Sequence, residues 1–258
     1  MARFAANLTY LFTELPMPQR FAAAKNAGFD GVEILFPYDL AIKELTVAAQ
    51  ASSLEFLLMN CPPPNWSGGS RGFAAEPNRQ DRFRTDFDRA LKFAQGLRSR
   101  HILIMAGKAE GEAARRTFIE NLRWASARAP HASLLIEPMN QTDMPGYYLS
   151  DFDLAAEIIT EIQAPNLGLL FDAYQAQMIH GDLLSAWRKY AEISRHIQIA
   201  GCPDRHEPRQ GQGPGETDYI AFFRAVQESG YSGWVGAEYL PQTTTEAGLR
   251  WLKEGRNQ

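Results

Sequence analysis

Short apolar runs alternate with segments of helical periodicity along the chain. Each run is nearly continuous in apolar residues, as in "GVEILF", which is typical of a strand buried on both faces. We predict eight strands, at residues 3–8, 31–36, 55–60, 101–107, 132–138, 166–172, 195–201 and 233–239. Between them, apolar residues recur three and four positions apart, which predicts helices that dock on a sheet. These helices are predicted at residues 18–28, 82–97, 114–129, 151–162, 182–193 and 218–230.

Strands that alternate with helices indicate a parallel sheet covered by helices. Eight such units in 258 residues fit a closed (β/α)8 TIM barrel, which typically has about 250 residues. A doubly wound open sheet is the alternative, but no G-x-G-x-x-G motif follows the first predicted strand. We therefore expect an α/β fold with a single TIM-barrel domain over residues 1–258. Gly28 and Gly230 are expected to end helices, and Ser150 or Asp151 to begin one.

One connection is too long to be a plain turn. Residues 61–78, "CPPPNWSGGSRGFAAEPN", are rich in Pro, Gly and Ser. Loops of this length that lack regular structure are usually functional or disordered. We interpret the segment as a loop over the active site, and a disordered excursion is the alternative.

Charge and cysteine content exclude several classes of protein. The net charge is −4 and the pI is near 5.8, whereas proteins that bind nucleic acids carry clustered Lys and Arg. Cys61 and Cys202 are far apart and have no zinc-site spacing, so we interpret both as buried free thiols. No secretory signal and no run of about 18 apolar residues occurs. We expect a soluble, cytoplasmic protein with neither nucleic acid nor a membrane as partner, and a homo-oligomer stays open.

The segment "LLIEPMN", residues 134–140, is unusual because an apolar run ends in a carboxylate, Glu137. A carboxylate in such surroundings is costly, or its pKa shifts, unless it has a partner. The last four predicted strands all end in polar residues, which are Glu137, Asp172, Gln198 and Glu238. Because the active site of a barrel lies at the C-terminal ends of its strands, three carboxylates would repel each other there. We therefore predict a divalent metal bound by these four residues.

The predicted ligands are all oxygen donors, which favours a hard cation. Mg²⁺ or Mn²⁺ is predicted and Co²⁺ stays open, whereas Zn²⁺ prefers nitrogen and sulfur ligands. The alternative is that each acid caps a helix or pairs with an Arg or Lys. The histidines His101, His131, His180 and His196 are interpreted as structural or surface residues, since none is spaced with a Cys or a second His as a ligand pair would be.

The segment after the seventh predicted strand, residues 201–216, is typical of a loop that faces a substrate. Arg205 is the candidate to bind an anionic or polyhydroxyl substrate, because a guanidinium presents a planar fork of donors to a carboxylate. Lys108, after the fourth strand, and Arg71, in the long loop, are further candidates. The alternative for Arg205 is a solvated surface side chain.

A metal flanked by two glutamates suits proton abstraction from a carbon next to a carbonyl. The metal stabilises the negative charge that develops on the carbonyl oxygen. One glutamate then removes a proton to give a cis-enediolate, and the other delivers a proton to the neighbouring carbon or to the opposite face. The first outcome is aldose-ketose isomerisation and the second is epimerisation. We expect Glu137 and Glu238 to act both as ligands and as acid or base, and Asp172 and Gln198 to bind the metal alone.

At these residues the sequence resembles the hydroxypyruvate isomerase family, within the xylose isomerase-like barrels that also include ketose 3-epimerases and endonuclease IV. The similar segments extend over nearly the whole chain and include "RFAANLTYLFTELP", "AGFDGVEILFPYD", "LLIEPMN", "HIQIAGCPDRHEP" and "PQTTTEAGLRW". The resemblance implies paired acid/base glutamates at Glu137 and Glu238 and a substrate contact at Arg205. It also implies a Mg²⁺ or Mn²⁺ site formed by Glu137, Asp172, Gln198 and Glu238.

Two positions depart from the family pattern. Where relatives commonly show Asp-x-x-His after the sixth strand, this chain has "DAYQ", with Gln175 in place of the histidine. Where hydroxypyruvate isomerases tend to read "EPINH", it has "EPMNQ", with Gln141. Imidazole carries a proton or a positive charge and an amide does not, so recognition of the substrate is open to change at these positions. Gln175 is retained as a substrate-binding candidate.

We therefore predict a metal-dependent isomerase that interconverts hydroxypyruvate and tartronate semialdehyde. The segments "IMAG" and "IAGCPDRHEP" resemble the related 2-oxo-tetronate isomerases, so 2-oxo-tetronate is an alternative substrate, and ketose 3-epimerisation is another alternative. A noncatalytic sugar-acid binding protein is an alternative from another class. A DNA phosphodiesterase like endonuclease IV would use several metals, many histidines and a basic groove, which five His and a net charge of −4 do not favour.

Overall fold

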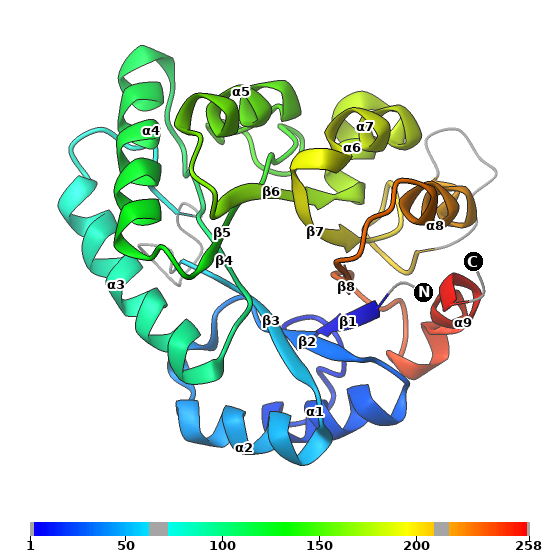
Figure 1. Cartoon of the computed structure of the whole chain (residues 1–258). Coiled ribbons are helices and arrows are strands. Elements are labelled where there is room, and N and C mark those ends of the chain that lie inside the picture. Colours follow the sequence, from blue (N-terminus) through cyan, green and yellow to red (C-terminus); the bar gives the residue numbers. More distant parts are fainter. Residues whose placement is uncertain (1–2, 62–71, 209–216, 257–258) are drawn as a thin grey trace. The chain divides into compact units, whose positions relative to one another are not determined.

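The computed structural model describes residues 3–61, 72–208 and 217–256. In this part of the chain, eight parallel strands form a closed barrel whose strand order is the order in the sequence (Figure 1). The strands are β1 (Arg3–Asn7), β2 (Gly31–Glu33), β3 (Glu55–Asn60), β4 (His101–Leu103), β5 (Ser133–Ile136), β6 (Leu167–Asp172), β7 (Ser194–Ile199) and β8 (Trp234–Ala237). The predicted (β/α)8 barrel is confirmed.

Helices separate the strands along the chain (Figure 1). They are α1 (Met17–Asn26), α2 (Ile42–Ser52), α3 (Gln80–Leu97), α4 (Gly111–Arg128), α5 (Phe152–Ile162), α6 (Ala173–His180), α7 (Leu183–Tyr190), α8 (Tyr219–Glu228) and α9 (Arg250–Arg256). Three 3-10 helices also occur in the described residues, which are η1 (Pro37–Asp39), η2 (Ala191–Ile193) and η3 (Glu246–Gly248).

Every predicted strand and helix is present, but apolar periodicity does not predict α2, α6 or α9. Helix α2 buries only Leu45, so it has no apolar stripe to detect. Helices α6 and α9 are only eight and seven residues long, about two turns each. The predicted helix ends are confirmed. Asp151 accepts hydrogen bonds from the backbone at the start of α5, and Gly28 and Gly230 have positive φ just beyond α1 and α8.

The described chain forms two compact units. The first comprises the described residues within 1–35, 43–57 and 171–258, and the second comprises those within 36–42 and 58–170. Each unit is described by itself below. A single domain over residues 1–258 stays a prediction.

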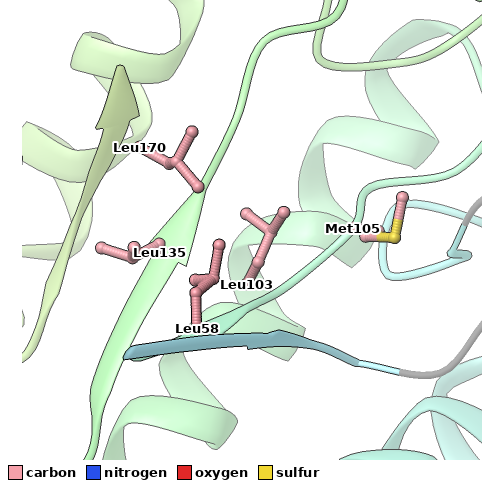
Figure 2. Packing of buried hydrophobic residues seen from close by; sticks show 5 residues of the cluster. All are labelled: Leu58, Leu103, Met105, Leu135 and Leu170. Atoms are coloured by element: carbon pink, nitrogen blue, oxygen red, sulfur yellow. The ribbon is translucent and has the colours of Figure 1, made fainter. Parts of the chain in front are cut away.

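An apolar cluster lies in the second unit. Its residues come from β3, β4, β5 and β6 and from the segment that follows β4. Leu58, Leu103, Met105, Leu135 and Leu170 form this cluster. Figure 2 shows Leu58, Leu103 and Leu135 close together, with Leu170 and Met105 on either side. Leu103 and Leu135 are partners in the pairing of β4 with β5. Since side chains alternate along a strand, the cluster lies on one of the two faces of these strands, both of which are buried.

Two predicted site residues follow this cluster along their strands. Glu137 lies two residues after Leu135, and Asp172 lies two residues after Leu170. The period of two places each carboxylate on the same face of its strand as the leucine that precedes it. Within the second unit, Glu137 therefore lies on the same face as the apolar cluster.

Truncation of the cluster is expected to destabilise the protein strongly. Leu135 is fully buried, so Leu135→Ala removes buried carbon atoms and leaves a cavity. We expect the free energy of unfolding to fall by about 2–5 kcal/mol, measured by urea denaturation. Val47→Ala is the control, because Val47 is 55% exposed on α2 and its truncation should change stability by less than about 0.5 kcal/mol. Equal losses in the two variants would contradict this assignment of the core.

Residues 72–78, at the C-terminal end of the long connection, lie along the segment that follows β4. Gly72 forms an isolated bridge with Ala106, and the Ala75 N–H donates to the Ala106 carbonyl at 2.8 Å. Gly72 has a φ of 76°, and a Cβ there would lie 2.3 Å from the Met105 Cβ, so this position requires glycine. Residues 62–71, with Arg71 among them, lie outside the described residues. The loop over the site therefore stays a prediction.

Both cysteines are free thiols, with Cys61 buried as predicted and Cys202 partly exposed, contrary to the prediction. Cys202 is exposed because it lies in the turn after β7 rather than in the strand itself. Within residues 3–61, 72–208 and 217–256, no helix has both the length and the apolar character to cross a membrane. The cytoplasmic location stays a prediction.

Candidate active site

The four predicted metal ligands lie at strand ends and are nearly inaccessible to solvent. Glu137 directly follows β5, Asp172 ends β6, Gln198 lies in β7 and Glu238 directly follows β8. Their exposed fractions are between 1% and 7%. Because buried carboxylates are costly without a partner, each of them needs an opposing cation or hydrogen-bond donors.

In the first unit, two of these carboxylates share one guanidinium group. The Nη2 atom of Arg205 donates to Asp172 Oδ2 at 3.3 Å and to Glu238 Oε1 at 3.1 Å. The Arg205 Cζ also lies 4.9 Å from the centre of the Tyr174 ring, which positions the guanidinium by a cation–π contact. The structure therefore brings the ends of β6 and β8 together around one positive charge.

The backbone of Arg205 is held in an unusual conformation. Its φ is 54°, in the left-handed region, and its carbonyl accepts a hydrogen bond from the Leu240 N–H at 2.9 Å. Leu240 follows β8, so the loop after β7 is tied to the segment after β8. The Arg205 side chain is 20% exposed, so part of it is open to solvent.

Asp172 both ends β6 and caps α6. Its Oδ1 accepts a hydrogen bond from the Tyr174 backbone N–H at 2.8 Å. Burial raises the pKa of the Asp172 carboxyl above its ordinary value, and the Arg205 guanidinium and the backbone N–H groups of Tyr174 and Gln175 oppose this rise. The carboxylate of Glu33 raises that pKa further. A second cation beside Asp172 would stabilise its ionised form.

Another buried carboxylate, that of Glu33, was not among the predicted site residues. It ends β2 and is fully buried. Its Oε1 lies 2.5 Å from His196 Nε2, and its Oε2 accepts hydrogen bonds from Gln198 Nε2 at 2.8 Å and from Asn7 Nδ2 at 3.2 Å. The interpretation of His196 as a structural residue is consistent with its position, because it is fully buried beside Glu33.

A glycine in β8 makes room for the Glu33 side chain. Gly236 is opposite Ala5 of β1 and Gln198 of β7 in the sheet register. A Cβ at position 236 would lie 1.9 Å from Glu33 Oε1, which no structure tolerates. The carboxylate of Glu33 therefore crosses over β8 at Gly236 to reach β7.

The amide of Gln198 fits the predicted role of a metal ligand. Its Nε2 donates to Glu33, while its Oε1 is buried and has no hydrogen-bond partner among the described residues. Glu238 lies two residues beyond Gly236, the partner of Gln198, so Gln198 and Glu238 project from the same face of the sheet. An orphan carbonyl oxygen on the face that also carries carboxylates is the donor set that a hard cation prefers.

Among the described residues, no group of three or more His, Cys, Asp and Glu side chains has the geometry of a metal site. Such a group requires carboxylates, imidazoles or thiolates, and one predicted ligand, Gln198, is an amide. Asp172 and Glu238 meet at a guanidinium instead of at each other. The predicted metal therefore stays a prediction that the donor types fit.

The remaining predicted residues lie in different surroundings. Glu137 belongs to the second unit and is 7% exposed, while Lys108 of the same unit has an exposed side chain. Gln175 is fully buried in the first turn of α6. Gln141 closes its own loop, since its Nε2 donates to the Tyr147 carbonyl and its Oε1 accepts from the Gly146 N–H.

The structure thus brings together Asp172, Glu238 and Arg205, and it joins Gln198 to Glu33. One signal in the sequence could have revealed Glu33 as a residue of the site. The first three strands also end in polar residues, which are Asn7, Glu33 and Asn60. The pattern that singles out the last four strands therefore extends around the barrel.

Comparison with known proteins places this chain among related sequences over its whole length. The family described as "Xylose isomerase-like TIM barrel" matches residues 21–255. A 2-oxo-tetronate isomerase from Cupriavidus necator is 42% identical over 259 residues, which cover 98% of each chain. A hydroxypyruvate isomerase from Escherichia coli is 40% identical over 258 residues, again covering 98% of each chain.

A solved structure is also very similar. The crystal structure of an AP endonuclease, family 2, from Brucella melitensis has a TM-score of 0.93 and 41% identity, and the alignment covers 98% of each chain. The resemblance of the sequence to hydroxypyruvate isomerases and 2-oxo-tetronate isomerases is confirmed. With a family match over most of its length and relatives about as long as itself, this chain belongs to the xylose isomerase-like TIM barrel family.

Proposed function

We propose that this protein is a metal-dependent isomerase that interconverts hydroxypyruvate and tartronate semialdehyde. The observation that carries the proposal is the meeting of Asp172 and Glu238, from the ends of β6 and β8, on one guanidinium nitrogen of Arg205. Identity of 40–42% to hydroxypyruvate isomerase and 2-oxo-tetronate isomerase over 98% of the chain supports the reaction class. A small hydroxy-oxo acid is the partner that this activity requires.

Four oxygen donors are proposed to bind the metal, Mg²⁺ or Mn²⁺ with Co²⁺ as a further option. They come from Glu137, Asp172, Gln198 and Glu238. When bound, the cation supplies a Lewis acid that lowers the energy of negative charge on a carbonyl oxygen. The buried, unpartnered Oε1 of Gln198 supports this proposal, since the described residues offer it no hydrogen bond.

Proton transfer is proposed for the two glutamates. Glu137 removes the proton from the carbon next to the carbonyl, which gives an enediolate of the substrate, and Glu238, protonated before this step, delivers its proton to the neighbouring carbon. The hydroxyl proton of the substrate passes to the former carbonyl oxygen, and the two glutamates end the turnover with exchanged protonation states. Both side chains are more than nine-tenths buried, so little water reaches them to compete for the proton. Glu238 is already oriented by the hydrogen bond from Arg205 at 3.1 Å.

Substrate binding is proposed for Arg205. Its side chain is 20% exposed, so it is accessible to a ligand while it stays anchored to Asp172 and Glu238. A guanidinium has five N–H donors in a planar fork, a geometry that suits the carboxylate of a substrate. Gln175, Lys108 and Arg71 stay further candidates for contacts with the substrate.

A second candidate reaction is 2-oxo-tetronate isomerisation. The relative from Cupriavidus necator with this name is 42% identical, slightly more than the hydroxypyruvate isomerase from Escherichia coli at 40%. The two substrates share a carboxylate and an adjacent carbonyl and differ in chain length. The length of the substrate that the protein converts therefore decides between them.

Exchange of substrate protons with solvent tests the reaction. Metal-loaded protein in D₂O is expected to incorporate deuterium at the carbon next to the carbonyl, followed by NMR, with hydroxypyruvate first and 2-oxo-tetronate and a ketose as comparisons. Removal of the metal with a chelator is expected to abolish the exchange, and Mn²⁺, Mg²⁺ or Co²⁺ to restore it.

Other outcomes of this experiment would point to other functions. Binding of a sugar acid without exchange would favour a noncatalytic binding protein. Cleavage of abasic DNA by the loaded protein would favour a phosphodiesterase, the activity that the name of the Brucella melitensis protein suggests for that protein. Either result would overturn the isomerase proposal.

A further inference from the structure

The hydrogen bonds of Glu33 determine which end of the Gln198 amide faces away from it. An ionised carboxylate only accepts hydrogen bonds, so the amide atom that lies 2.8 Å from Glu33 Oε2 is the nitrogen of Gln198. The amide oxygen of Gln198 is thereby directed to the other side, where the described residues offer it no hydrogen bond. Without Glu33, the two ends of the amide would be interchangeable.

Glu33 is itself held on several sides. His196 Nε2 lies 2.5 Å from its Oε1, and Asn7 Nδ2 donates to its Oε2 at 3.2 Å. All three side chains are fully buried, so water does not compete for these contacts. The backbone of β8 at Gly236 lies against the carboxylate, since a Cβ at that position would be 1.9 Å from Glu33 Oε1. The acceptor that faces Gln198 therefore has little freedom to move.

We propose that Glu33 is a positioning residue that orients the amide of Gln198, so that Gln198 Oε1 is presented to the cation. This inference rests on the proposed function, because the cation is the ligand that the amide oxygen would bind. Mutation of a residue that orients a metal ligand typically lowers metal affinity by about 10–100-fold. Glu33 does not contact the substrate in this proposal and takes no part in proton transfer.

Binding of Mn²⁺ alone to the purified full-length protein tests the proposal, measured by titration calorimetry and by the electron paramagnetic resonance signal of free Mn²⁺. Glu33→Leu removes the acceptor at nearly constant volume, and we expect its Kd for Mn²⁺ to rise about 10–100-fold. Glu33→Gln keeps an oxygen acceptor for Gln198 and places its NH₂ group beside His196, so its Kd should stay close to that of the wild type.

Gly236→Ala provides a second route to the same effect. The added methyl group removes no polar atom but displaces the Glu33 carboxylate, which should again raise the Kd for Mn²⁺ about 10–100-fold. If Glu33→Leu lacks the circular dichroism spectrum of the wild type, Gly236→Ala decides the matter. Asp86→Asn is the matched control, because Asp86 is a buried carboxylate of α3 in the second unit and pairs with Arg82 at 2.9 Å.

The kinetic readout separates positioning from a merely structural role. At saturating Mn²⁺, kcat of Glu33→Leu and Gly236→Ala should return close to the wild-type value, because the added metal fills the weakened site. Loss of turnover that metal does not restore, or an unchanged Kd in the folded variants, would overturn the proposal for Glu33 and leave the isomerase proposal intact. A wild-type protein that binds no Mn²⁺ would instead contradict the proposed function itself.

Discussion

Glu137→Gln is expected to lower kcat by about 10²–10⁴-fold while the protein stays folded. An amide oxygen has nearly the same shape as a carboxylate oxygen and still donates a lone pair to a cation, but it does not take up a proton at neutral pH. If Glu137 removes the proton of the substrate, the variant loses the chemical step and keeps the fold. Turnover is measured at saturating metal and substrate, with deuterium exchange in D₂O as the direct record of proton removal.

Glu120→Gln is the matched control for this experiment. Glu120 is an exposed residue of α4, in the same unit as Glu137, so the same chemical change there should leave kcat unchanged. Unchanged exchange in Glu137→Gln would remove the acid/base pair from the mechanism. The isomerase would then need a different base.

Arg205→Met is expected to raise the KM for hydroxypyruvate by roughly 10–100-fold, because a hydrogen bond to a charged group contributes about 1.5–3 kcal/mol. The methionine keeps part of the apolar stem but removes the fork of donors that would bind the substrate carboxylate. It also removes one positive charge beside Asp172 and Glu238, which adds electrostatic repulsion against an anionic substrate. KM is measured with saturating metal, so that metal binding does not limit the rate.

Two comparisons make this second result specific. Arg205→Lys keeps the positive charge without the planar fork, and its KM should lie between the values of the wild type and of Arg205→Met. Arg123→Met is the control, since the Arg123 side chain is 53% exposed on α4 and its KM should match that of the wild type. A rise in KM that is as large for an uncharged ketose as for the acid would contradict a carboxylate contact.

The barrel was accessible from the sequence because its signal is repeated. Each strand that is buried on both faces is an apolar run, and each docked helix carries a stripe, so that a weak local signal recurs along the chain. The pattern does not reveal the short helices α6 and α9 or helix α2, which has no stripe. Helix α2 shows why, since Leu45 is its one buried residue among the eleven of that helix.

The candidate site was accessible only in part. A polar residue at the end of an apolar strand can be recognised from the sequence alone, and this pattern predicts Glu137, Asp172 and Glu238 as site residues. Gln141 shows the limit of this approach. The sequence left substrate recognition open to change at Gln141, whereas both ends of its amide bind the backbone of its own loop. The sequence does not distinguish an amide that closes a loop from one that faces a ligand.

The sequence by itself determined the order of strands and helices and the polar residues at the strand ends, because both depend on positions along one chain. Only the tertiary structure decided which of these residues meet. Glu33 reaches His196, 163 positions away, because the sheet register places Gly236 beneath its carboxylate and leaves that space empty. Arg205 joins Asp172 to Glu238 because its backbone turns into the left-handed region and the loop is tied to Leu240. Such contacts depend on register and free volume, which the order of residues does not display.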